Sequence, residues 1–572
     1  MLLAPAPRTV DNPATAEQIG EFDLPGQPTE PLGQVTGAEG GRLMTPTIIR
    51  SPYPDVPIPE VSLPALVLED AATRATKPAL IDGPSGHTIT FGELVDRVRL
   101  VAGGLAARGL QRGEVFAIYC PNLPEYAVAF YGVLLAGGTN TTINPLYTVD
   151  ELAAQLHDAG ATYLLTIPAF LDKAIQTAAR SDVREVFVLG EAEGATPFAE
   201  LLDAGRQPPK VAIDPHDDLA VLPYSSGTTG LPKGVMLTHH NLVANLCQCQ
   251  PVIDVGEDEV GIAVLPFFHS YGLTVLMALA LWQGATLVTM PRFDLEQFLT
   301  ILQDYRVTRA ALVPPIVLAL AKHPLVDRFD LSALRFISSG AAPLGAELQQ
   351  ACGKRLACVS AQGYGLTETS PVLTTNPPEE ARIRYGSVGQ LLPNTEARVV
   401  DLAGGEALGR DQDGELCFRG PQLMRGYLHR PEETAQMLDP DGWLHSGDIG
   451  HVDDDGYFYV VDRVKELIKY KGQQVAPAEL EAVLVSHPAI ADAAVVRTSD
   501  EQAGEVPKAF VVASSELSAD EVITWVAERV APSKKVRVVE FVDEIPKSPS
   551  GKILRRVLME RDRQAADSGP PS

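Results

Sequence analysis

The sequence predicts an α/β protein in which largely parallel sheets are covered by helices and a small α+β unit follows. Three observations predict this fold class. Short apolar runs alternate with helical patterns up to about residue 400, glycine- and hydroxyl-rich turns follow several predicted strands, and a strand-and-turn pattern takes over beyond that residue. Ligands of open α/β sheets collect at the carboxyl ends of strands, so these turns are expected to form a binding site.

The alternation is clearest between residues 219 and 305. LAVLP (219–223) leads into a glycine-rich loop and a helix over 241–250, IAVLP (262–266) leads to a helical run, and ATLVTM (285–290) leads to the helical pattern FDLEQFLTILQDY. Each apolar run is short enough for a strand covered on both faces. A sheet with parallel neighbours is therefore expected here.

The C-terminal pattern differs from the alternation before it. VDDDG followed by YFYVV, over 452–461, predicts a β-hairpin. AELEAVLVSH (478–487) and ADEVITWVAERV (519–530) predict helices, and DAAVVRT and AFVVAS predict strands between them. We expect a disordered tail over 1–45, a large domain over 46–464, a small α+β domain over 465–560 and a frayed tail over 561–572.

Length and charge limit the classes of function. A chain of 572 residues is too long for one core and suits two to four domains. The formal net charge of −27 argues against a wide basic face for nucleic acid, so any polyanionic ligand must meet local positive charge. No apolar run is long enough to span a membrane, and the N-terminus is a poor signal peptide. The six cysteines lack zinc-type spacing, which favours reduced thiols in a cytoplasmic protein.

One loop carries the strongest chemical signal. YSSGTTGLPKGV (224–235) combines serines, threonines and glycines with Lys233 directly after an apolar strand. Glycines bring backbone N–H groups close to a charged ligand, and the hydroxyls and the lysine add donors, which is how phosphates are held. The spacing is not that of a P-loop, because Val235 stands where a Ser or Thr would follow Gly-Lys. A different nucleotide chemistry is therefore indicated.

Six stretches together resemble the adenylate-forming superfamily, which includes acyl-CoA synthetases, beetle luciferases and nonribosomal adenylation domains. They are the loop above, AQGYGLTET (361–369), GELCFRG (414–420), WLHSGDIG (443–450), VDRVKELIKYKGQQV (461–475) and PKSPSGKILRR (546–556). They occur in the family order, and the chain looks most like the 4-coumarate–CoA ligase branch. The resemblance implies a large domain that includes a small distorted barrel, followed by a small mobile domain.

The resemblance also implies a reaction and its co-substrates. Enzymes of this kind use ATP and Mg²⁺ to turn a carboxylate into an acyl-adenylate with release of pyrophosphate, and the thiol of coenzyme A then displaces AMP. Two negative groups must be brought together in the first step, which requires a metal ion, a positioned lysine and backbone donors. The expected partners are a small carboxylic acid, ATP and CoA, with no nucleic acid or membrane span, in a monomer or homodimer.

Nucleotide contacts are implied for matching positions. The loop over the β- and γ-phosphates would consist of Ser225, Ser226, Gly227, Thr228, Thr229, Gly230 and Lys233. Tyr364 would present its ring to adenine between Gly363 and Gly365, with Gln362 beside them and Gly340, Ala341 and Ala342 along the adenine edge. Thr367 would contact phosphate, and Glu368 would bind Mg²⁺. Asp448 would take both ribose hydroxyls, and Arg463 would contact the adenylate.

The small domain would supply a different group to each half-reaction. Lys552 resembles the lysine that bridges the attacking carboxylate and the α-phosphate. Lys465 resembles the hinge about which the small domain rotates. Lys469 and Gln474 resemble residues that face the thiolation channel after that rotation.

The acyl pocket is implied by PFFHSYGL (266–273), in which His269 and Tyr271 match the acyl-side pair. Ala341, Gly365, Pro371 and Val372 would line the rest. Small residues at 341 and 365 would leave a flat slot that suits an aromatic ring and also admits an alkyl chain. We therefore expect a ligase for 4-coumarate-like aryl acids. The alternative is a medium- or long-chain fatty acyl-CoA or acyl-AMP ligase.

Other classes of function are less well supported by the residues. A nonribosomal adenylation domain would need an acid in the pocket segments to pair with an amino-acid ammonium, and none is obvious. An oxygenating luciferase activity stays open as a side activity. A catalytically inactive nucleotide-binding or scaffold protein would be expected to have lost Lys552, Glu368, Asp448 or Arg463, and all four are present.

Overall fold

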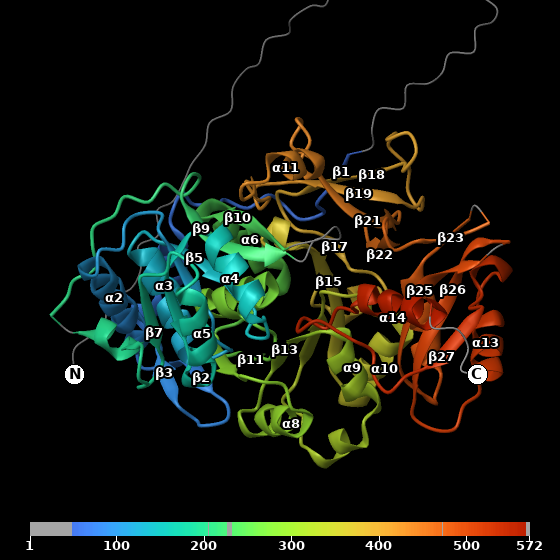
Figure 1. Ribbon diagram of the computed structural model, residues 1–572, viewed down its shortest axis with the longest axis horizontal. Coiled ribbons are helices and arrows are strands. Elements are labelled where there is room, and N and C mark those ends of the chain that lie inside the picture. The colour runs from blue at the N-terminus through green and yellow to red at the C-terminus, as the bar shows by residue number, and fades with distance from the viewer. Residues whose placement is uncertain (1–47, 204, 226–231, 472, 501, 568–572) are drawn as a thin grey trace, which may run out of the picture. The chain divides into compact units, whose positions relative to one another are not determined.

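A computed structural model describes residues 48–203, 205–225, 232–471, 473–500 and 502–567. Residues 46–572 form one unit, and the predicted tail over 1–45 lies outside the described residues. The α/β fold class is confirmed (Figure 1). None of the described helices is long and apolar enough to cross a lipid bilayer.

The first large sheet has eight strands, and its centre is parallel. Val115–Ile118 is buried along its whole length, as expected for a strand covered on both faces. In spatial order the strands are β20 (Gly426–Tyr427), β10 (Lys233–Thr238), β9 (Leu219–Ser225), β5 (Thr139–Thr142), β4 (Val115–Ile118), β6 (Ala161–Thr166), β7 (Glu185–Val188) and β8 (Thr196–Pro197).

The second large sheet has nine strands and is parallel from β15 to β2, with antiparallel pairs at both ends. Its order is β17 (Gln390–Leu391), β16 (Val372–Thr375), β15 (Val359–Gly365), β14 (Phe336–Ser339), β13 (Arg309–Leu312), β11 (Val260–Ala263), β12 (Thr286–Thr289), β2 (Pro78–Asp82) and β3 (Thr88–Thr90). One continuous hydrophobic core joins residues of both large sheets.

Helices connect these strands, and several begin with capping boxes. Thr90 with Glu93, and Thr148 with Glu151, satisfy the first backbone N–H groups of α2 and α4. The helices are α1 (Leu63–Leu68), α2 (Phe91–Ala107), α3 (Pro124–Leu135), α4 (Val149–Asp158), α5 (Leu171–Ala178), α6 (His239–Ile253), α7 (Leu279–Gln283), α8 (Leu295–Asp304), α9 (Pro314–Lys322), α10 (Ala346–Leu356) and α11 (Pro431–Met437).

A five-stranded antiparallel sheet stands where the small barrel was expected. Its strands are β1 (Ile49–Arg50), β18 (Glu396–Val400), β19 (Gly414–Arg419), β21 (Leu444–Val452) and β22 (Phe458–Arg463). The pair β21–β22 is the hairpin predicted from VDDDG and YFYVV. This sheet has its own hydrophobic cluster, which includes Phe418 and Phe458.

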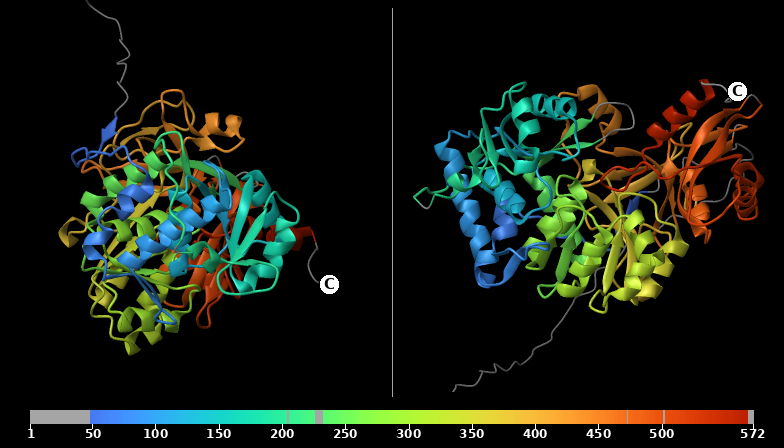
Figure 2. Two further views of the ribbon diagram at one scale, coloured as in Figure 1. Left: turned by 90° about the vertical axis from the view of Figure 1, so that its left-hand side faces the viewer. Right: turned by 60° about the horizontal axis from the view of Figure 1, so that its bottom comes forward.

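The C-terminal elements form the α+β unit that the sequence predicts, coloured orange to red in Figure 2. They are β23 (Ile468–Tyr470), β24 (Gln473–Val475), α12 (Pro477–Ser486), β25 (Ile490–Asp500), β26 (Gly504–Ala513), α13 (Ala519–Ala527), β27 (Val538–Phe541) and α14 (Arg555–Asp567). A separate core that contains Ile468, Leu480 and Val495 joins all of them except α14, which packs through Leu558 against Val496 and Phe510 in a second cluster. The last helix continues past residue 560 to Asp567, and Thr498 Oγ1 donates to Asp562.

Candidate active site

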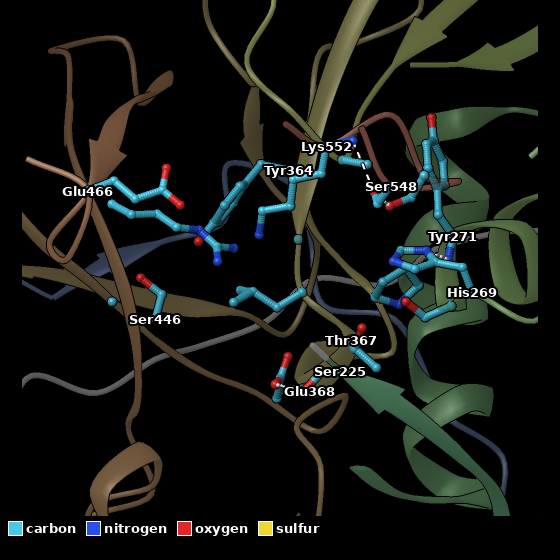
Figure 3. A pocket seen from close by; sticks show the side chains of 18 of the residues that line it. Ser225, His269, Tyr271, Tyr364, Thr367, Glu368, Ser446, Glu466, Ser548 and Lys552 are labelled. Carbon is cyan, nitrogen blue, oxygen red and sulfur yellow. Dashed lines mark hydrogen bonds between the residues drawn. The ribbon is translucent and has the colours of Figure 1, made fainter. Parts of the chain in front are cut away.

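One large cleft brings together most of the residues that the sequence singles out. Its volume of about 2160 Å³ exceeds that of a pocket for one small ligand, so it can take more than one substrate. The predicted residues that line it are Ser225, Lys233, His269, Tyr271, Ala341, Gly363, Tyr364, Gly365, Thr367, Glu368, Pro371, Val372, Arg463, Lys465, Lys469 and Lys552. Figure 3 shows several of these side chains from close by.

His269 lies in the loop that follows β11, and Tyr271 is the first residue of a π-helical stretch, Tyr271–Ala278. Such stretches are rare and are frequent at functional sites. The Tyr271 N–H donates to His269 Nδ1 at 3.3 Å, and the Tyr271 hydroxyl lies 3.4 Å from Ser338 Oγ. Burial, and then Lys552, lower the pKa of His269 to about 4, so its imidazole is neutral at pH 7.

The segments of Gly365 and Val372, which also line the cleft, are held by close packing and by side-chain hydrogen bonds to the backbone. A Cβ atom at Gly365 would lie 1.9 Å from the Pro371 carbonyl oxygen, so only glycine fits there. Asn245 of α6 accepts from the Val372 N–H at 3.1 Å and donates to the Val372 carbonyl at 2.8 Å. Both segments are therefore held in one conformation beside the cleft.

Tyr364, Asp448 and Arg463 form a bonded group on the other side of the cleft. The Tyr364 hydroxyl donates to Asp448 Oδ2 at 2.6 Å, and Arg463 Nε lies 3.1 Å from Asp448 Oδ1. Asp448 and Arg463 are register partners in the β21–β22 pair. Burial raises the pKa of Asp448, and the Arg463 guanidinium opposes that shift. A carboxylate has about four lone-pair sites, so Asp448 can still accept further hydrogen bonds.

Glu368 is a buried carboxylate, 7% exposed, held through one of its two oxygens. Ser225 Oγ donates to Oε1 at 3.0 Å, and the Tyr427 hydroxyl donates to the same oxygen at 2.7 Å. Among the described residues no hydrogen bond is made to Oε2. Lys233 lies close by, with Nζ 5.1 Å from the centre of the Tyr427 ring. The carboxylate therefore keeps one oxygen for a ligand.

Lys552 enters the cleft from the loop before α14. Its backbone N–H donates to Ser548 Oγ at 3.1 Å, which shapes the turn (Figure 3). Its ammonium makes no hydrogen bond or ion pair with any described residue. Burial, and then the charge of Arg463, lower the pKa of Lys552 to about 8, although Glu466 opposes this. A cation in such surroundings is stabilised by an incoming anion.

Some predicted residues lie outside the lining. The glycine-loop residues Ser226, Gly227, Thr228, Thr229 and Gly230 fall outside the described residues. Of the described residues, Gly340, Ala342, Gln362, Asp448 and Gln474 do not line the cleft. Asp448 lies directly behind Tyr364 and Arg463, whereas the Gln362 amide donates to Leu344 O and Gln349 Oε1.

Gly340 and Gln474 nevertheless lie next to lining residues. A Cβ atom at Gly340 would lie 3.0 Å from the Tyr271 ring. Gln474 is exposed and is the cross-strand partner of Lys469 in the β23–β24 hairpin.

Sequence reasoning missed several residues that shape the site. Ser338 contacts the Tyr271 hydroxyl, Asn245 fixes Val372, and Tyr427 donates to Glu368. Ser338 stands two residues before Gly340 in a stretch already singled out, which was the only local signal. Asn245 and Tyr427 lie in a helix interior and a short strand, and only the tertiary structure brings them to the site.

Comparisons with known proteins agree with this geometry. A family model described as AMP-binding enzyme matches residues 67–428, and one described as AMP-binding enzyme C-terminal domain matches residues 479–552. A 4-coumarate–CoA ligase of Pinus taeda is 46% identical over 526 residues, which cover 90% of this chain and 97% of that protein. 4-Coumarate–CoA ligase 5 of Oryza sativa subsp. japonica is 46% identical over 91% of this chain and 98% of that protein.

Solved structures show the same fold. The anthranilate CoA ligase AuaEII in complex with anthranoyl-AMP matches with a TM-score of 0.82 and 26% identity, over 90% of this chain and 99% of that chain. ATP-bound MatB from Rhodopseudomonas palustris matches with a TM-score of 0.80 and 30% identity, over 88% of this chain and 99% of that chain. The chain therefore belongs to the AMP-binding enzyme family, the adenylate-forming superfamily that its motifs resemble.

Proposed function

We propose that this protein is an ATP-dependent carboxylate–CoA ligase that acts on 4-coumarate-like aryl acids. In the first half-reaction a carboxylate oxygen attacks the α-phosphorus of ATP, and pyrophosphate leaves with the electron pair of the broken P–O bond. In the second, the sulfur of CoA attacks the acyl carbon, AMP leaves, and the thiol proton passes to solvent.

The observation that carries this proposal is the Lys552 ammonium, which has no partner among the described residues and lines the same cleft as His269, Tyr271 and Arg463. An acyl group beside His269 and a nucleotide beside Tyr364 would place two anions close to this one cation. Their mutual repulsion opposes the first half-reaction, and the lysine would offset it. Neutral His269 would contact the acyl carboxylate without competing for it as a second cation.

The nucleotide would bind along the bonded group on the other side of the cleft. Asp448 would accept both ribose hydroxyls, Tyr364 would stack on adenine, and Arg463 would contact the adenylate phosphate. Lys233 and Thr367 would contact the β- and γ-phosphates, together with Ser225 and the loop residues beyond it. These roles rest on the contacts given above and on the family's motifs.

The residues around Glu368 fit Mg²⁺. The ion prefers oxygen ligands and keeps several waters, and Glu368 has one oxygen without a hydrogen bond to a described residue. Ser225 and Thr367 add hydroxyls beside it. When bound with ATP, Mg²⁺ would neutralise phosphate charge. Ser225 and Tyr427 orient the carboxylate by donating to its other oxygen.

Two observations support an aryl acid as substrate. The relatives at 46% identity are named 4-coumarate–CoA ligases, and Figure 3 shows Tyr271 beside His269 in the part of the cleft where we place the acyl group. The Tyr271 hydroxyl lies 3.4 Å from Ser338 Oγ, and both hydroxyls keep capacity for a further hydrogen bond, which a polar ring substituent can use and an alkyl chain cannot. These relatives therefore do not favour a fatty acyl-CoA or acyl-AMP ligase.

The second half-reaction would use the exposed hairpin of β23 and β24. Lys469 and Gln474 face each other across it, and rotation about Lys465 would bring them to the thiolation channel. The proposal also includes a domain boundary at about residue 465. It further includes a monomeric or homodimeric state and a cytoplasmic location.

Steady-state release of pyrophosphate tests the substrate class. Purified protein is assayed with ATP and Mg²⁺ against 4-coumarate, cinnamate, benzoate, octanoate and palmitate, each with and without CoA. We expect CoA-dependent turnover to be highest with 4-coumarate. A higher kcat/KM for octanoate or palmitate would contradict the aryl assignment, and no turnover with any acid would contradict the ligase itself.

A further inference from the structure

Two of the sequence motifs contain residues that the proposed function does not use. GELCFRG supplies Glu415 and Cys417 on β19, and WLHSGDIG supplies His445 on β21. The two strands pair antiparallel with Cys417 directly opposite His445. The register of this pair shifts between Glu415 and Cys417, and the Glu415 carboxylate nevertheless reaches the His445 ring. The fold thus gathers a thiol, an imidazole and a carboxylate at one place.

The three side chains meet at one nitrogen. Cys417 Sγ lies 3.4 Å from His445 Nδ1, and Glu415 Oε2 lies 3.0 Å from the same atom. All three ligand atoms lie within 4.8 Å of one another. Ligands of a tetrahedral zinc ion lie about 3.3–3.6 Å apart, given bond lengths of about 2.0–2.3 Å. Small side-chain movements would therefore let all three atoms bind one ion.

A role for Cys417 as a nucleophile does not fit this arrangement. Its side chain is 0% exposed, so no acyl substrate can reach the sulfur. Asp439 lies 3.7 Å from His445 Nε2, but its carboxylate is paired with Arg398 at 2.9 Å. Glu415 and His445 do line the cleft, which gives a small cation a route to the sulfur that a substrate lacks.

We propose that Glu415, Cys417 and His445 form a binding site for a thiophilic divalent cation of the Zn²⁺ type. On binding, the Cys417 S–H bond is broken, the proton passes to solvent, and the sulfur bonds to the metal. A water from the cleft takes the fourth position. Mg²⁺ does not compete, because it prefers oxygen ligands and avoids thiolate.

The site adjoins the nucleotide-binding side of the cleft. Glu415 Oε1 accepts from the Gly447 N–H at 3.0 Å, and Gly447 directly precedes Asp448. The Gly447 carbonyl accepts from the Val464 N–H at 3.0 Å, next to Lys465. The carboxylate that binds the cation through Oε2 therefore also holds the turn before Asp448 through Oε1.

The chain offers a natural control in a second cluster of possible ligands. Glu60, His216 and His240 also place ligand atoms within 4.8 Å of one another, and this cluster contains no sulfur. A cation bound there differs spectroscopically from one bound to Cys417. Cys358 is a partly exposed thiol outside both clusters and controls for binding to any accessible cysteine.

The test titrates Co²⁺ into the reduced, metal-free full-length protein in excess Mg²⁺. We expect a sulfur-to-cobalt charge-transfer band and the visible bands of tetrahedral cobalt to saturate at one equivalent, and Zn²⁺ to reverse them. Cys417→Ser should abolish the charge-transfer band, and His445→Gln should weaken Zn²⁺ binding by about 10-fold or more. Cys358→Ser and His216→Gln should leave the charge-transfer band and the affinity of this site for Zn²⁺ unchanged.

Absence of the charge-transfer band in the wild-type protein would overturn the proposal. So would a band that survives in Cys417→Ser, or Zn²⁺ binding that only His216→Gln reduces. Melting temperatures show whether each variant is folded. Should Cys417→Ser unfold, His445→Gln decides the outcome, because the His445 side chain is 30% exposed and its loss leaves no buried cavity.

Discussion

The two sides of the cleft differ in how their charged groups are held. On the side where we propose that the nucleotide binds, Asp448 is bonded to Tyr364 and Arg463, and Glu368 is bonded to Ser225 and Tyr427. On the side contributed by the C-terminal unit, the Lys552 ammonium has no bonded partner among the described residues. The large domain thus presents a preorganised binding surface, and the C-terminal unit presents a cation that an anion would stabilise.

This difference suggests that one set of groups serves substrate binding and the other serves the chemical step. Groups that are already bonded cost little reorganisation when a ligand arrives, so they suit recognition. A partly buried cation without a bonded partner among the described residues gains most when negative charge arrives beside it, so it suits transition-state stabilisation. Substitutions on the two sides should therefore affect different kinetic constants.

Lys552→Ala is expected to have the largest effect. Loss of the cation should lower the rate of acyl-adenylate formation by about 10²–10³-fold, the usual result of removing one such electrostatic group. The variant should still convert supplied acyl-adenylate and CoA to the thioester at close to the wild-type rate. Pyrophosphate release and thioester formation are measured separately, and equal losses in both would remove the distinction between the two sides.

Asp448→Asn should affect binding more than chemistry. The change removes the ion pair with Arg463 and a charge-assisted acceptor for the ribose, so KM for ATP should rise by about 10–100-fold. The value of kcat at saturating ATP should fall much less. Initial rates at varied ATP concentration check this. The melting temperature of the variant shows whether leaving Arg463 without its ion-pair partner destabilises the fold. A fall in kcat with KM unchanged would contradict a binding role.

The pH dependence of kcat/KM for adenylation should reveal the titration of the Lys552 ammonium. Its pKa is lowered to about 8, and only the protonated form can neutralise the reacting anions. The kcat/KM for adenylation should therefore fall by about 10-fold per pH unit above pH 8, because this constant reports the free enzyme. Bound ATP favours the cation, so the fall in kcat should begin at higher pH.

Lys552→Arg is the matched variant for this profile, since a guanidinium stays protonated throughout the range. Its activity should be lower, but the alkaline fall in kcat/KM should disappear. An unchanged alkaline fall would assign the titration to another group.

Lys469→Ala should have the smallest effect and the opposite selectivity. Lys469 is exposed on its hairpin, so its loss removes little packing. Thioester formation from supplied acyl-adenylate should slow several-fold, to about 10-fold, the result of losing one exposed charged contact. Pyrophosphate release without CoA should stay near the wild-type rate, and a selective loss of that step would contradict the proposed role.

The sequence predicted the fold class and many of the elements because each of these depends on local pattern. The β–α alternation gave the two large sheets, and the hairpin over 452–461 and the helix at 478–487 are present as predicted. The π-helical stretch that begins at Tyr271 could not be distinguished from an ordinary helix, because its apolar pattern is the same.

The candidate site was predicted where motifs carry it and missed where distant segments meet. The Tyr427–Glu368 contact joins residues 59 positions apart, and the Asn245–Val372 contact joins residues 127 positions apart. Neither Tyr427 nor Asn245 belongs to a recognisable motif. The meeting of Cys417 and His445 likewise depends on strand register, which one sequence does not reveal.

The most direct test of the central claim is a single-turnover experiment on the wild-type enzyme with 4-coumarate, ATP and Mg²⁺, first without CoA. We predict that one equivalent of 4-coumaroyl-adenylate forms on the enzyme with one equivalent of pyrophosphate. Added CoA should then convert it to the thioester with release of AMP. Thioester formation without a preceding adenylate, or an adenylate formed from fatty acids but not from 4-coumarate, would contradict the account.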